Sequence, residues 1–89
     1  MNNKNFSYDE ILAVWNKGKV IPGYNPSEYR KDIGGLLMIF GEYGNTDSLY
    51  GWEIDHICPK SLGGSDNIYN LQPLQWMNNR AKGNHYPTY

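Results

Sequence analysis

Four polar residues in the second half of the chain have the types and spacing of a metal-assisted hydrolytic site. Asp55 and His56 are adjacent, and Asn79-Arg80 follow near the end. The carboxylate of Asp55 and the amide oxygen of Asn79 are hard ligands suited to Mg²⁺ or Mn²⁺, which fill their remaining positions with water and phosphate oxygens. His56 is then free to act as a general base that takes a proton from an attacking water. The pattern therefore predicts phosphodiester hydrolysis at a magnesium or manganese site.

Further polar residues fit the same chemistry. Asn70 either fixes the tautomer or orientation of His56, or ties the loop backbone in place. Arg80, Lys82 and Lys60 are the candidate phosphate contacts, with the planar fork of Arg80 the best suited. The formal net charge is −1, so any DNA contact surface has to be local, because DNA affinity usually comes from Lys and Arg that displace counterions.

The elements that must position these residues can be read from the pattern. Residues 52–57 alternate apolar and polar types, which predicts a half-buried strand. Neighbouring residues on a strand point to opposite faces, so Asp55 and His56 can share a site only if the strand end is twisted or bulged. A Gly- and Ser-rich loop over residues 60–67 leads to an extended stretch over residues 71–74. A last helix is expected from about Gln75 to Gly83.

The first half of the chain has its own start and stop signals. Ser7 and Glu10 form a capping-box pattern ahead of a helix over residues 8–17, and Gly18 supplies a left-handed stop. An Asn-Pro-Ser-Glu sequence predicts a second short helix over residues 26–31.

An apolar run over residues 36–40 fits either a buried strand or a short helix, and we favour the strand. Residues 42–51 form a turn-rich connection. The 89 residues suffice for one small core, which the 15% aromatic content favours. No segment approaches a membrane span, so a soluble, intracellular protein with no membrane partner is expected.

Two segments together resemble the HNH endonuclease family. Residues 51–67 read GWEIDHICPKSLGGSDN and residues 70–83 read NLQPLQWMNNRAKG. The resemblance implies that His56 is the general base, that Asn70 is the middle residue of the motif and that Asn79 is the last, with Asp55 as the metal-binding acid. It also implies an α+β fold ending in a ββα-metal motif. We expect a single domain over residues 1–89, in which residues 1–49 brace a motif at residues 50–84.

The cysteine pattern departs from that of many family members. Those members carry a Cys-x-x-Cys pair that binds structural zinc, and Gln75 and Asn78 stand at the equivalent positions here. Cys58 is the only cysteine, so a cysteine-based zinc site cannot form within one chain. We expect no structural zinc.

The function that follows is a metal-dependent DNA endonuclease that cuts one strand per active site. Cutting both strands would need two copies, and a homodimer fits that need. The alternative is a catalytically silent DNA-binding or protein-interaction module that retains the fold. Whether Glu53 or His85 joins the site is left open by the sequence.

Overall fold

The C-terminal half of the protein is a strand hairpin followed by a helix, and the first half of the chain packs beside it. In the computed structural model, which describes residues 5–83, β4 (Trp52–His56) pairs with β5 (Leu71–Gln75), and α2 (Trp76–Lys82) follows directly. The strand, the second extended stretch and the last helix expected from the sequence are therefore present in that order. The α+β class is confirmed.

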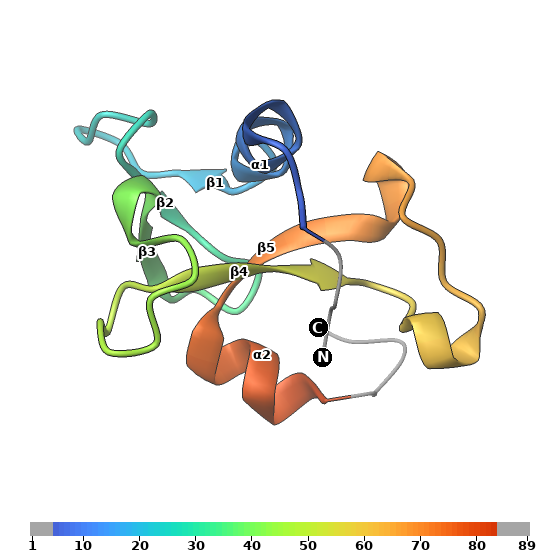
Figure 1. Cartoon of the computed structure of the whole chain (residues 1–89). Helices are drawn as coiled ribbons and strands as arrows, with labels where there is room; N and C mark the ends of the chain where they lie inside the picture. Colours follow the sequence, from blue (N-terminus) through green and yellow to red (C-terminus); the bar gives the residue numbers. More distant parts are fainter. Residues whose placement is uncertain (1–4, 84–89) are drawn as a thin grey trace.

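The register of the hairpin is regular. Trp52 lies opposite Gln75, and the five pairs run without interruption to His56 opposite Leu71. Helix α1 (Tyr8–Trp15) lies on one face of this hairpin and α2 lies on the other (Figure 1). Each strand therefore presents alternate residues to α1 and to α2.

Helix α1 begins as the sequence predicts. The hydroxyl of Ser7 accepts the backbone N–H of Glu10 at 3.1 Å, and the Glu10 carboxylate accepts the N–H of Ser7 at 2.9 Å. Two of the N–H groups that lack an intrahelical partner are thereby satisfied. The helix buries Val14 and Trp15 against the hairpin.

An aromatic core joins the two halves of the chain. The rings of Trp15 and Trp52 are 5.1 Å apart, and the Phe40 ring lies 5.4 Å from Trp15. Aromatic pairs at such distances stabilise a core by more than the burial of their apolar area alone would. The buried apolar residues are Val14, Trp15, Met38, Trp52, Ile54, Leu71 and Leu74.

The prediction of a helix over residues 26–31 is wrong. Residues 26–28 form a single turn, and β2 (Tyr29–Lys31) then pairs with β1 (Lys19–Val20) and with β3 (Leu37–Ile39) in an antiparallel sheet. The capping contacts of Asn25 do form, since its side-chain oxygen accepts the N–H of Ser27 at 3.0 Å. Pairing with two strands overrides that local signal.

Two smaller expectations also change. Helix α1 ends with Asn16 in the right-handed region, and Gly18 instead lies in close packing, because a Cβ there would lie 3.1 Å from the Cβ of Arg30. The loop expected over residues 60–67 contains a short 3-10 helix, η2 (Lys60–Leu62). The strand favoured within residues 36–40 is confirmed as β3, and η1 (Phe40–Glu42) follows it.

The helices between residues 5 and 83 are short. The longer α-helix has eight residues, and none of the described helices is long and apolar enough to cross a membrane. A third 3-10 turn, η3 (Ile68–Asn70), leads into β5.

Candidate active site

One cavity at the end of β4 collects most of the polar residues singled out from the sequence. It has a volume of about 350 Å³, and β4, the loop after it and α2 form its walls. Six of the seven candidate residues line it, namely Asp55, His56, Lys60, Asn79, Arg80 and Lys82. Asn70 is the one that does not.

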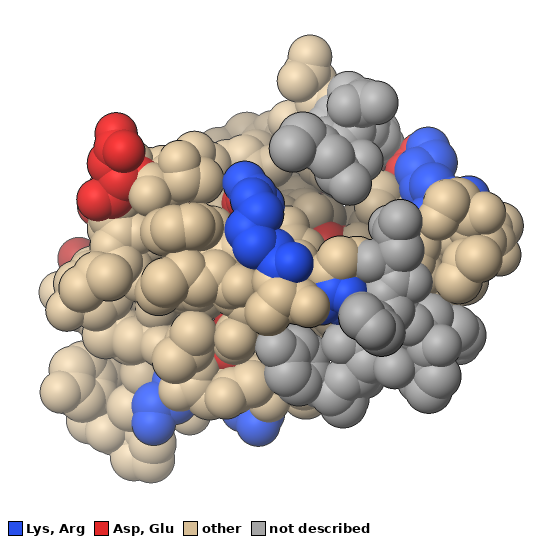
Figure 2. Space-filling model, turned by 90° about the horizontal axis from the view of Figure 1, so that it is seen from below, with Lys and Arg blue, Asp and Glu red and all other residues tan. Residues whose placement is uncertain are grey.

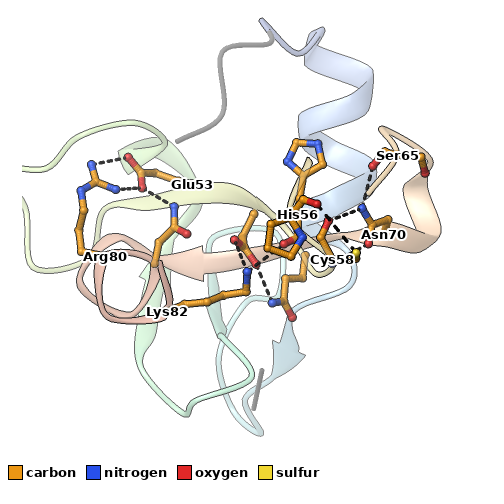
Figure 3. Close-up of polar contacts among 11 residues, drawn as sticks. Glu53, His56, Cys58, Ser65, Asn70, Arg80 and Lys82 are labelled. Atoms are coloured by element: carbon orange, nitrogen blue, oxygen red, sulfur yellow. Dashed lines mark hydrogen bonds and ion pairs between the residues drawn. The ribbon is translucent and has the colours of Figure 1, made fainter. Parts of the chain in front are cut away.

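Asp55 and His56 point to opposite faces of β4, because the regular register contains no bulge. The Asp55 side chain faces α2, where Lys82 contacts it. The His56 ring faces the α1 side, 6.5 Å from the ring of Phe6, and Figure 3 shows it directed away from Lys82. Both residues line the cavity, but the bulge expected from the sequence does not occur, and their side chains stay on opposite faces.

Asp55 is a buried carboxylate with two partners. The Lys82 ammonium lies 3.2 Å from its Oδ1, and the Gln72 amide donates a 2.9 Å hydrogen bond to its Oδ2. Burial raises the pKa of Asp55, and the hydrogen bond from Gln72 and the charge of Lys82 offset part of that rise. Gln72 was missed in the sequence, although it stands directly opposite Asp55 in the hairpin register.

Lys82 lies inside the protein, whereas the sequence suggested a surface contact to phosphate. Its side chain is 1% exposed, and its ammonium also donates a 2.9 Å hydrogen bond to the backbone oxygen of His56. Lys82 therefore links the end of α2 to the end of β4. Lys60 and Arg80 remain exposed enough to meet a ligand, with 54% and 47% of their side chains accessible.

Asn79 is held by Glu53, a residue whose role the sequence left open. The Asn79 amide nitrogen donates a 2.8 Å hydrogen bond to Glu53, so the amide oxygen is turned away from that carboxylate. Arg80 donates two hydrogen bonds to the same carboxylate, at 2.7 and 3.1 Å (Figure 3). Burial raises the pKa of Glu53, but the bonds from Arg80 and Asn79 together hold it below its ordinary value.

His56 has a carboxylate partner that the sequence analysis missed. Its Nε2 lies 2.7 Å from Oδ1 of Asp66, and Lys60 donates to the other Asp66 oxygen at 3.1 Å. The hydrogen bond from His56, followed by that from Lys60, lowers the pKa of Asp66. A carboxylate only accepts, so the tautomer that fits this contact has its proton on Nε2 and a lone pair on Nδ1. The only sequence signal was the place of Asp66 in the Gly-Gly-Ser-Asp loop.

The side chain of Asn70 holds the loop after β4 together through hydrogen bonds to its backbone. Its side-chain oxygen accepts the N–H of Cys58 at 2.8 Å, and its amide nitrogen donates to the backbone oxygens of Cys58 and Ser65 at 3.0 and 2.8 Å (Figure 3). These bonds close the loop that carries Asp66. No hydrogen bond joins Asn70 to His56 within the described residues. Of the two roles that the sequence left open, these contacts match the tie of the loop backbone and not the orientation of His56.

Two side chains of the cavity carry oxygen donors of the kind that hard divalent cations take, and both oxygens of one of them, Asp55, have partners in Lys82 and Gln72. Asp55 offers a carboxylate and Asn79 an amide oxygen, and Mg²⁺ commonly takes only one or two protein carboxylates with waters and phosphate oxygens. Among residues 5–83, no three His, Cys, Asp or Glu side chains cluster in the way a metal cage would require. His85 lies outside the described residues.

Fold and site together define a ββα domain with a polar cavity between its hairpin and its helix. The sequence model of the HNH endonucleases matches residues 44–88, just over half of the chain, and the chain belongs to this family. Members are typically nucleases that act on DNA and use divalent metal ions. Comparisons with curated proteins and with solved structures give no match.

Proposed function

We propose that the protein is a metal-dependent DNA endonuclease that hydrolyses one strand per active site. The observation that carries this proposal is the shared cavity, which is lined by Asp55, His56 and Asn79 together with two exposed basic residues, Lys60 and Arg80. A cavity of this composition has the parts that phosphodiester hydrolysis requires: a base, hard ligands and phosphate contacts.

In the proposed mechanism Asp55 and Asn79 would hold Mg²⁺ or Mn²⁺, and the chemistry supplied there would be stabilisation of the negative charge on the phosphate oxygens. Glu53 fixes the amide of Asn79 so that its oxygen stays available, and Gln72 orients the Asp55 carboxylate. Lys82 offsets the buried charge of Asp55.

His56 serves as the general base through Nδ1. Asp66 accepts the proton on Nε2 and so keeps the ring in the tautomer whose Nδ1 can take a proton from water. Asn70 acts indirectly, because it holds the loop that delivers Asp66. It is a positioning residue in this account.

Arg80 and Lys60 are the proposed phosphate contacts. On the face of the molecule in Figure 2, the basic side chains of the described residues lie apart from one another, in keeping with the net charge of −1. Affinity for DNA therefore depends on the few cations at the cavity, and two copies of the chain would be needed to cut both strands.

A plasmid-nicking assay tests the proposal. Supercoiled DNA is incubated with the purified protein and with Mg²⁺, Mn²⁺ or EDTA, beside Asp55→Asn and a matched exposed acid, Asp47→Asn. Open-circular product is expected only with metal, from the wild type and Asp47→Asn. A folded wild type that nicks nothing with either ion would favour the silent DNA-binding or interaction module.

A further inference from the structure

Asp32 is a buried carboxylate that the proposed mechanism does not use. Its side chain is fully buried, although it belongs to the turn between β2 and β3, well before the motif in sequence. A buried carboxylate is costly unless it is hydrogen-bonded, so its contacts define its purpose.

Those contacts reach the start of α2. Oδ2 of Asp32 accepts the backbone N–H of Gln75 at 3.0 Å and the side-chain amide of Asn78 at 2.9 Å. Oδ1 accepts the N–H of Leu36 at 2.9 Å and so closes the turn that carries Asp32. One carboxylate thus joins a turn of the first half of the chain to the helix that carries Asn79.

The packing around Asp32 is close. A Cβ at Gly34 would lie 2.6 Å from the side-chain nitrogen of Asn78, so a larger residue there would displace the amide that donates to Asp32. The same helix start is also held by Gln75, whose amide donates to the backbone oxygen of Leu49 at 3.0 Å. Gln75 and Asn78 stand where the sequence resemblance places the zinc-binding cysteines of other members.

We propose that Asp32 is a positioning residue that fixes the first turn of α2 and thereby the metal ligand Asn79. The inference rests on the proposed function for the role of Asn79. Residues 75–78 are anchored by Asp32, and Asn79 follows them directly, so a shift of this turn displaces the Asn79 amide from Glu53 and from the cavity.

The decisive variant is Asp32→Asn, which keeps the shape of the side chain. It replaces one carboxylate oxygen with an NH₂ group, which would face either the N–H of Leu36 or the two donors Gln75 and Asn78, so in both orientations a donor faces a donor. Asp47→Asn makes the same chemical change at an exposed site. Asn78→Ala removes only one of the three contacts and serves as the intermediate case.

Two measurements are made on each variant. Amide hydrogen exchange reports the order of α2 without any metal, and the Mn²⁺ concentration giving half-maximal DNA cleavage reports the metal site. In Asp32→Asn we expect α2 amides to exchange at least tenfold faster relative to those of β4, and the half-maximal Mn²⁺ concentration to rise at least tenfold. Asn78→Ala should change both in the same direction by less, and Asp47→Asn should change neither.

Exchange in α2 that is unchanged by Asp32→Asn would overturn the anchor itself. Faster exchange with an unchanged Mn²⁺ requirement would show that Asp32 supports stability alone and would overturn the positioning role. A wild type that cleaves no DNA would overturn the proposed function instead. Calorimetric Mn²⁺ binding would then replace cleavage as the second measurement, and equal affinity in wild type and Asp32→Asn would again overturn the positioning role.

Discussion

The ammonium of Lys82 lies 3.2 Å from the carboxylate of Asp55, and the two side chains are only 1% and 7% exposed. This buried pair joins the last turn of α2 to the end of β4. Removing one partner of such a pair leaves the other charge buried and uncompensated.

Lys82→Met should therefore destabilise the fold strongly. We expect a loss of about 3–5 kcal/mol in the free energy of unfolding, measured by urea denaturation. Lys31→Met, at an exposed position, should stay within about 0.5 kcal/mol of wild type. A loss for Lys82→Met as small as that of the control would mean that the pair is open to solvent.

Glu53→Gln should weaken the metal site without touching a ligand. The amide oxygen of glutamine can still accept from Asn79 and from one Arg80 N–H, but its NH₂ group would face the second Arg80 N–H, which Oε2 now accepts, and the charge that holds Arg80 is lost. Loss of a group that orients a metal ligand typically costs about 10–100-fold in metal affinity or activity. Titration of cleavage with Mn²⁺ measures the change, and an unchanged titration would remove Glu53 from the site.

Arg80→Ala and Lys60→Ala should weaken DNA binding most at low salt. Each proposed phosphate contact contributes about 0.9 to the slope of log K against log salt concentration, so each variant should bind with a shallower slope. Fluorescence anisotropy with a DNA duplex across a salt series provides the measurement. Lys31→Ala is the matched exposed control. An equal fall of the slope in this control would mean that DNA attracts all surface cations alike and that Arg80 and Lys60 make no specific phosphate contact.

Chelation should leave the fold intact. Cys58 is the only cysteine, and the core of residues 5–83 is formed by aromatic and aliphatic side chains without a metal cage. The melting temperature followed by circular dichroism should be the same in EDTA and in Mg²⁺-free buffer. A large fall in EDTA would reveal a structural metal.

The sequence predicted the elements whose signals are local. The capping box of Ser7 and Glu10 and the alternation over residues 52–57 depend on near neighbours, and both elements formed. The second helix failed because the pairing of β2 with two other strands is a long-range effect that the Asn25 cap does not encode.

The polar contacts of the site were harder to predict. The bond from His56 to Asp66 depends on the path of the loop, which spacing alone does not define. The inward position of Lys82 could have been predicted, because Lys82 follows Asn79 by three residues and so lies on the same face of the helix. Placing Asn79 at the site should have placed Lys82 there too.

The most direct test of the account compares cleavage and metal binding in His56→Ala. Single-turnover cleavage of a DNA duplex is measured at saturating Mn²⁺, beside calorimetric Mn²⁺ binding to the same protein. If His56 is the base and Asp55 and Asn79 are the ligands, the rate should fall by a factor on the order of 10² to 10⁴ while the affinity for Mn²⁺ is unchanged. An undiminished rate, or a loss of Mn²⁺ affinity in this variant, would contradict the assignment of His56 as the general base.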